Sequence, residues 1–225
     1  NSNLKKHLKV YTGVAAAMLA HEKASGQIVY VDINPDTLIE GFVCQPASGI
    51  FNLDMNNDAL IDFELKASKK AWPCTGFYDH LREIKITPLN GNKVKQGYYW
   101  NLTSSSTNLI LDPSNLSSGD TIDFSGNWAS NSGFLVMHTW TNSSHAQFFS
   151  WRGGWWPIYP ATFPIEGYLP LMLNISSNNY YGWLRVEVLS DTSFRLKDFA
   201  YNTIPNAPII AGDTTNASLG INELS

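Results

Sequence analysis

The sequence predicts an all-β protein, a β-sandwich of jelly-roll type, preceded by a short helical segment that resembles a secretion signal. After residue 27, apolar and polar residues alternate, which is the period of a half-buried strand. Turn-forming Asn, Asp, Gly and Pro separate these alternating runs. Only 15% of the residues are charged and 13% are aromatic, a composition that favours strands. A chain of 225 residues has the length of one large β domain.

The first segment, residues 1–26, has the pattern of a secretory signal peptide. Basic residues including Lys5 and Lys9 precede an apolar run over 10–20, and small residues precede Gln27. The run is too short to cross a bilayer as a helix, so we expect no transmembrane helix. The alternative is an assembly helix, because five residues recur at helical spacing: Leu4, Leu8, Tyr11, Ala15 and Met18. We assign 27–212 to the sandwich and 213–225 to a polar tail.

Short strands are expected along the whole of 27–212. The expected strands are 27–33, 50–53, 61–65, 81–87, 98–102, 107–111, 120–124, 133–140, 145–150, 181–189 and 193–197. The clearest signal is the hairpin 181–197, in which Leu184, Val186 and Val188 share one face. About ten short strands separated by turns are typical of a sandwich.

An acidic loop follows the second expected strand. Oxygen-bearing side chains stand at positions 1, 3, 5 and 9 of a calcium loop, and a backbone carbonyl stands at position 7. The predicted Ca²⁺ ligands are Asp54, Asn56, Asp58, the carbonyl of Leu60, and Asp62. Two departures are Ala59 in place of the usual Gly and Leu65 in place of a closing Glu. The alternative is a turn capped by Asn and Asp side chains without metal.

Two cysteines, Cys44 and Cys74, predict one disulfide in an oxidising compartment, with two buried thiols as the alternative.

An aromatic segment over 140–159 predicts a ligand or assembly surface, because Trp rings stack on sugars and anchor interfaces. Its candidate residues are Trp140, Trp151, Arg152, Trp155, Trp156 and Tyr159. Some of these rings are expected in the core, with Trp155 and Trp156 at a glycine-hinged loop tip.

Charge and motifs exclude several classes of function. With 15 Lys and Arg against 19 Asp and Glu, the net charge of −4 excludes a nucleic-acid partner bound through a basic surface. No nucleophile elbow, phosphate loop or dinucleotide motif occurs, so we expect no catalysis. Glu166 and Glu187 are the carboxylates considered for glycoside hydrolysis, but an exposed ion pair between Glu187 and Arg185 is the preferred interpretation.

Four segments resemble a group of secreted proteins common in Bacteroidota. They are QIVYVDINPD at 27–36, the loop at 54–62, YYGWLRVEV at 180–188, and KDFAYN followed by IPNAPIIAG at 197–212. The resemblance implies an exported β protein of the cell surface, of the kind often carried by the type IX secretion pathway. It also implies O-glycosylation at Asp-Thr motifs, which places candidate sites at Thr37, Thr121 and Thr214. It implies no activity.

The sequence therefore predicts a non-catalytic extracellular protein. The first hypothesis is a self-assembling subunit of a surface fibre, sheath or layer, stabilised by Ca²⁺ and one disulfide, with other copies of itself as partner. The alternative is a calcium-dependent, lectin-like module that binds glycans. The second alternative is a small secreted glycoside hydrolase.

Overall fold

The computed structural model describes residues 28–41, 49–70, 79–103, 107–143, 146–155 and 163–215. Within these ranges every regular element is a strand, so the all-β prediction is confirmed. The segment 1–26, predicted to be a signal or an assembly helix, lies outside them. In the described part of the chain no helix is long and apolar enough to cross a membrane.

The described residues form fourteen strands: β1 (Ile28–Glu40), β2 (Ile50–Leu53), β3 (Phe63–Lys70), β4 (Asp79–Pro88), β5 (Lys93–Thr103), β6 (Thr107–Pro113), β7 (Thr121–Ile122), β8 (Asn127–Ala129), β9 (Gly133–Ser143), β10 (Ala146–Arg152), β11 (Ile165–Ile175), β12 (Asn178–Ser190), β13 (Ser193–Asn202) and β14 (Ile209–Ile210). Twelve make one sheet, in the order β1-β13-β12-β11-β5-β10-β9-β4-β3-β2, with β6 and β8 also paired to β5. The pairings are antiparallel, and β14 pairs with β7 in a separate small sheet.

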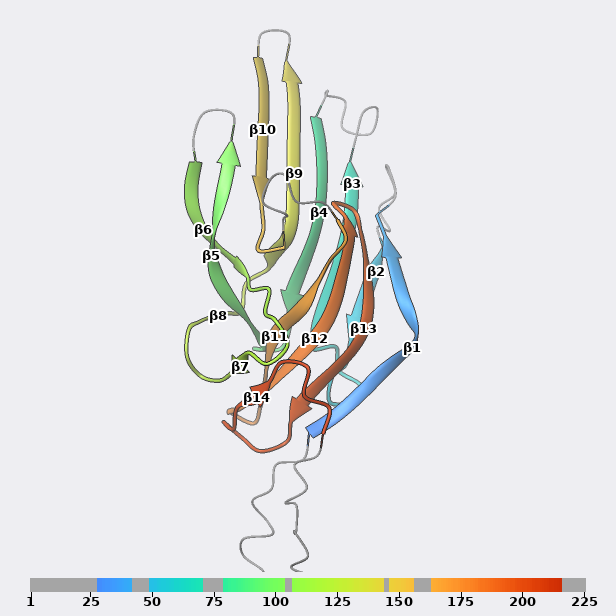
Figure 1. Ribbon diagram of the computed structural model, residues 1–225, viewed down its shortest axis with the longest axis vertical. Coiled ribbons are helices and arrows are strands. Elements are labelled where there is room, and N and C mark those ends of the chain that lie inside the picture. Colours follow the sequence, from blue (N-terminus) through green and yellow to red (C-terminus); the bar gives the residue numbers. More distant parts are fainter. Residues whose placement is uncertain are drawn as a thin grey trace, which may run out of the picture.

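The main core lies where β3, β4 and β9 pack against β11, β12 and β13 (Figure 1). The predicted inward face of the late hairpin is confirmed, because Leu184, Val186 and Val188 are all fully buried. Ile84 and Leu135 belong to the same cluster from the other side. Burying each such side chain contributes about 1.5–3 kcal/mol, so the alternation read from the sequence is what brings these strands together.

A second apolar cluster covers one end of the outer face of β11–β13. Trp183 and Tyr181, on β12, pack there with Ile122 of β7 and Ile209 of β14. The expected strand 120–124 is therefore reduced to the two residues of β7, which serves as a cover and not as part of the large sheet. Among the described residues, the other end of the same face has no such apolar cover.

Strands β4, β9 and β10 extend beyond the ends of β12 and β13 (Figure 1). On this extension, the rings of His80 and Trp140 stack with centroids 5.3 Å apart. The turn between β12 and β13 contributes Asp191, whose carboxylate lies 3.3 Å from Arg82 and 3.5 Å from His138. This ion pair ties the turn to strands β4 and β9.

Candidate functional site

An open pocket of about 510 Å³ lies between β11 and the loop that follows β6. Its lining residues are Tyr99, Asn115, Leu116, Ser117, Ser118, Gly154, Glu166, Gly167 and Tyr168. Leu116 and Tyr168 hydrogen-bond through their backbones in both directions, which holds the loop against β11. The pocket thus has a floor fixed by backbone pairing and a lining of hydroxyl, amide and carboxylate groups.

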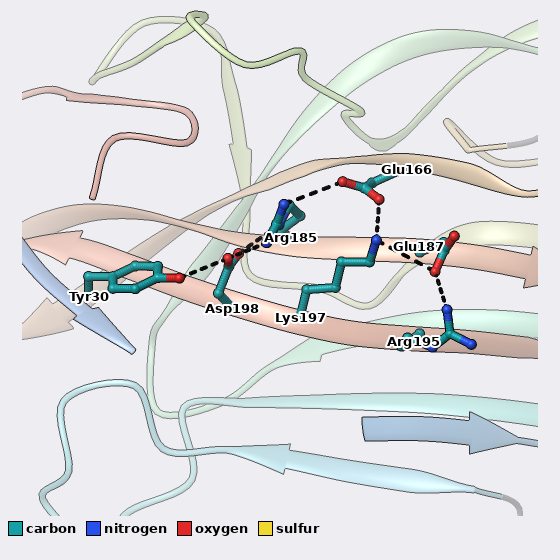
Figure 2. A network of polar contacts seen from close by, with 7 residues as sticks. All are labelled: Tyr30, Glu166, Arg185, Glu187, Arg195, Lys197 and Asp198. Carbon is teal, nitrogen blue, oxygen red and sulfur yellow. Dashed lines mark hydrogen bonds and ion pairs between the residues drawn. The ribbon is translucent and has the colours of Figure 1, made fainter. Parts of the chain in front are cut away.

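Glu166 is the one carboxylate among the lining residues, and two cations hold it in place. Lys197 of β13 hydrogen-bonds to Oε2 of Glu166, and the Arg185 guanidinium lies 3.6 Å from Oε1 (Figure 2). The hydrogen bond to Glu166 raises the pKa of Lys197. Glu166 lines the pocket, and its side chain is 40% exposed.

Behind Glu166, the charges continue as a network across β11, β12 and β13. Arg185 donates to both oxygens of Asp198, and the Tyr30 hydroxyl donates to Asp198 from β1 (Figure 2). Burial opposes the charged form of Arg185, but the hydrogen bond and charge of Asp198 raise its pKa. These contacts fix the arginine that lies beside Glu166.

The other end of the network corrects one expectation from the sequence. Glu187 does not pair with Arg185, its neighbour on the same strand face. It accepts a hydrogen bond of 2.6 Å from Arg195 and lies 3.7 Å from Lys197. Cross-strand partners on β13 are closer than the neighbour two residues away, as the pleat of a sheet requires.

Two tyrosines give the pocket its aromatic walls. The backbone N–H of Asn115 donates to the Tyr99 hydroxyl at 3.3 Å. The ring of Tyr168 meets the buried ring of Trp183 edge to face, with centroids 5.2 Å apart. The second apolar cluster therefore holds the Tyr168 ring in place. Glu166, two residues earlier on β11, is held by the charge network.

The acidic loop brings together part of the predicted calcium ligand set. The Asp54 carboxylate accepts the backbone N–H groups of Asp58 and Ala59, and the Asn56 amide donates to Asp58. Ala59 has a left-handed φ of 69°, the conformation for which Gly is usual at this position. The Leu60 side chain is exposed. These contacts describe a turn capped by its own side chains.

Asp62 lies on the inner side of this turn. Its carboxylate accepts the Met55 N–H at 2.8 Å and the Asn92 side-chain amide at 2.8 Å, and the residue is 5% exposed. Burial raises the pKa of Asp62, although both hydrogen bonds act in the opposite direction. Within the described residues no three His, Cys, Asp or Glu groups gather in a geometry that could hold a metal ion. Calcium binding by this loop stays a prediction.

The structure places residues of the aromatic segment in different environments, some at the surface and some in the core. Trp140 is 37% exposed, as a surface residue should be. Trp155 is 1% exposed and belongs to the main core, so its predicted place at a loop tip is wrong. The reason is the preceding glycine pair: a Cβ on Gly153 would lie 2.2 Å from the Leu135 carbonyl oxygen. The chain therefore passes close to β9, where Trp155 N–H bonds to that carbonyl.

Arg152, another residue of the predicted surface, forms a structural ion pair with Asp112. It donates twice to the fully buried Asp112 carboxylate, at 3.0 and 3.1 Å. The backbone of Trp151 pairs with His138 and with Leu102. Trp156 and Tyr159 lie outside the described residues, as do Cys44 and Cys74, so the disulfide stays a prediction.

The candidate glycosylation sites lie in the described part of the chain. Thr121 and Thr214 are exposed, and Thr37 is half-buried on β1. Their modification stays a prediction, because exposure permits glycosylation without requiring it.

Sequence reasoning missed the pocket itself. Its walls come from β5, the loop after β6, the turn after β10, and β11, which are separated in the sequence. The sequence presents Glu166 only as half of a candidate catalytic pair with Glu187. A usable signal was the spacing of Glu166 and Tyr168, which puts a carboxylate and an aromatic ring on one face of one strand.

No family model, curated protein or solved structure matches the chain.

Proposed function

We propose that this protein is a non-catalytic extracellular domain that binds carbohydrate in the pocket beside Glu166. The observation that carries the proposal is the lining of that pocket. Tyrosine rings, an amide, hydroxyls and one accessible carboxylate surround a volume of about 510 Å³. As part of the same proposal, the twelve-stranded sheet folds over itself as a jelly-roll sandwich, with the pocket on its outer face.

The lining favours a sugar over other small ligands. A sugar ring offers apolar C–H faces that pack on aromatic rings, and hydroxyls that need both donors and acceptors. Tyr99 and Tyr168 provide the rings, and Ser117 provides a hydroxyl. Glu166 accepts hydrogen bonds from adjacent hydroxyls, and hydrogen bonds to a charged group contribute about 1.5–3 kcal/mol each. The volume lies in the ordinary range for ligand pockets.

The carboxylates favour binding over hydrolysis. A glycosidase places two carboxyl groups on opposite sides of the bond that it cleaves. Here Glu166 and Glu187 are direct partners on β11 and β12, and Lys197 contacts both of them. Both carboxylates therefore serve the same ion-pair network, and only Glu166 lines the pocket among the described residues.

The test is a titration of the full chain with a panel of neutral oligosaccharides, in which binding is measured by calorimetry. The variant Glu166→Gln keeps the shape of the side chain and removes the charged acceptor. We expect it to weaken binding by about 10- to 100-fold, from the loss of about 1.5–3 kcal/mol. Glu40→Gln, at an exposed glutamate of β1, is the matched control and should bind as the wild type does. Equal binding by both variants contradicts the proposal.

A self-assembling subunit of a surface fibre, sheath or layer is the second candidate. The N-terminal segment 1–26, for which an assembly helix was the alternative interpretation, lies outside the described residues. What favours this candidate among the described residues is a strand edge, that of β6, which pairs on one side only. Both candidates place the protein outside the cell.

A further inference from the structure

Strand β6 presents an edge of the sheet that no described residue pairs with. One side of β6 hydrogen-bonds to β5 from Thr107 to Pro113. At the end of the strand, the Asp112 carboxylate accepts the Phe134 N–H of β9, and Pro113 has no N–H to donate to a further strand. The open part of the edge therefore runs over 107–111.

This edge lacks the usual protection against pairing with another chain. Natural edge strands are guarded by charges, bulges, prolines or short length. Strand β1 has a register shift between Asp32 and Thr37, and β2 has four residues. Residues 107–111 of β6 carry no charge and no proline. The charge that follows, on Asp112, is turned inward and neutralised by Arg152.

Exposed apolar side chains lie beside the same edge. Tyr98 of β5 and Leu111 of β6 are cross-strand partners, and they are 63% and 37% exposed. A strand added along β6 would pack its own side chains against Leu111. Cross-strand pairs of this kind contribute about 0.2–1 kcal/mol each.

We propose that two copies of this chain pair antiparallel through β6, so that one sheet continues across a two-fold axis. A second copy is the occupant that fits because each β6 satisfies the other, which leaves no new open edge. Its uncharged residues also meet their own counterparts without like-charge repulsion. The proposal supplies one contact for the second candidate function, because a two-fold pair is closed and a fibre, sheath or layer needs a further surface besides β6. It is independent of carbohydrate binding.

The test is the oligomeric state of the full chain, measured by sedimentation velocity from about 1 to 300 μM. Leu111→Lys places a charge on the edge of both copies, and we expect it to weaken dimerisation at least tenfold. The control is Leu38→Lys, at a leucine of β1 that is 48% exposed, and it should dimerise as the wild type does. Circular dichroism confirms that both variants fold.

Hydrogen exchange gives an independent reading of the interface. Amides of 107–111 should exchange more slowly as the wild-type concentration rises, and those of β1 should not change. A wild type that stays monomeric throughout overturns the proposal and self-assembly together, and leaves a strand from another protein as the partner of the edge. Oligomers that persist in Leu111→Lys overturn the β6 interface but retain self-assembly through another surface.

Discussion

Replacement of Arg152 by alanine should destabilise the fold strongly. The Arg152 guanidinium donates to both oxygens of Asp112, lies 4.9 Å from the centre of the Phe134 ring, and leaves Asp112 with no exposed surface. Removing the arginine leaves a buried carboxylate whose remaining hydrogen bond comes from the Phe134 N–H at 3.2 Å. Breaking a buried ion pair in this way costs about 3–5 kcal/mol. For a domain of this size that loss lowers Tm by roughly 6–20 °C.

The pH dependence of the loss identifies its cause. Burial raises the pKa of Asp112 above 3.8 although Arg152 acts in the opposite direction, so the variant should raise it further. When the pKa of a carboxyl is raised in the folded state, protonation of that carboxyl stabilises the fold. This stabilisation is complete below the pKa of the unfolded state and disappears as pH rises through the pKa of the folded state. The difference in unfolding free energy between wild type and Arg152→Ala should therefore be small near pH 3.8 and largest at neutral pH.

Denaturant unfolding at several pH values measures this difference, with two controls. Asp112→Asn combined with Arg152→Ala should recover part of the lost stability, because the amide carries no charge to bury. Arg152→Lys should give an intermediate loss, since an ammonium group cannot donate in the same paired geometry. A loss below about 1 kcal/mol that does not change with pH would refute the reasoning from a buried ion pair.

Three further predictions concern single residues. Ala59→Gly should raise the unfolding free energy by about 0.5–1 kcal/mol in urea, because glycine adopts the φ of 69° without strain; a loss would contradict the assigned backbone. If the acidic loop binds Ca²⁺, chelation should lower the Tm of the wild type but not of Asp58→Ala, and identical melting curves with calcium and chelator exclude the site. Burial alone would raise the pKa of Asp191, but His138 and Arg82 hold this pKa below 3.8. The stability that Asp191 adds over Asp191→Asn should thus be complete above that pH and fall as pH drops through the lower folded pKa, and an unchanged difference in acid would refute this.

The fold was predictable from the sequence where burial alone decides it. Leu184, Val186 and Val188 occupy alternate positions and therefore lie on one face of the strand. Only burial of that face removes all three from water. Trp155 was not predictable in this way, since two glycines before a tryptophan suit a flexible tip as well as a close passage against β9. The distinction depends on the Leu135 carbonyl, which is distant in the sequence. The pairing of Lys197 with Glu166, and the pocket that Glu166 lines, depend likewise on strand register across β11–β13.

The position of the pocket follows from how the outer face of β11–β13 is divided. At one end, β7 and β14 cover Trp183 and Tyr181 with apolar side chains. At the other end, charged side chains neutralise one another and need no cover (Figure 2). The pocket lies where the two regions meet, with Tyr168 from the apolar side and Glu166 from the charged side. A ligand bound there meets an aromatic surface and a fixed hydrogen-bond acceptor together, which is the combination that a sugar ring with its hydroxyls requires.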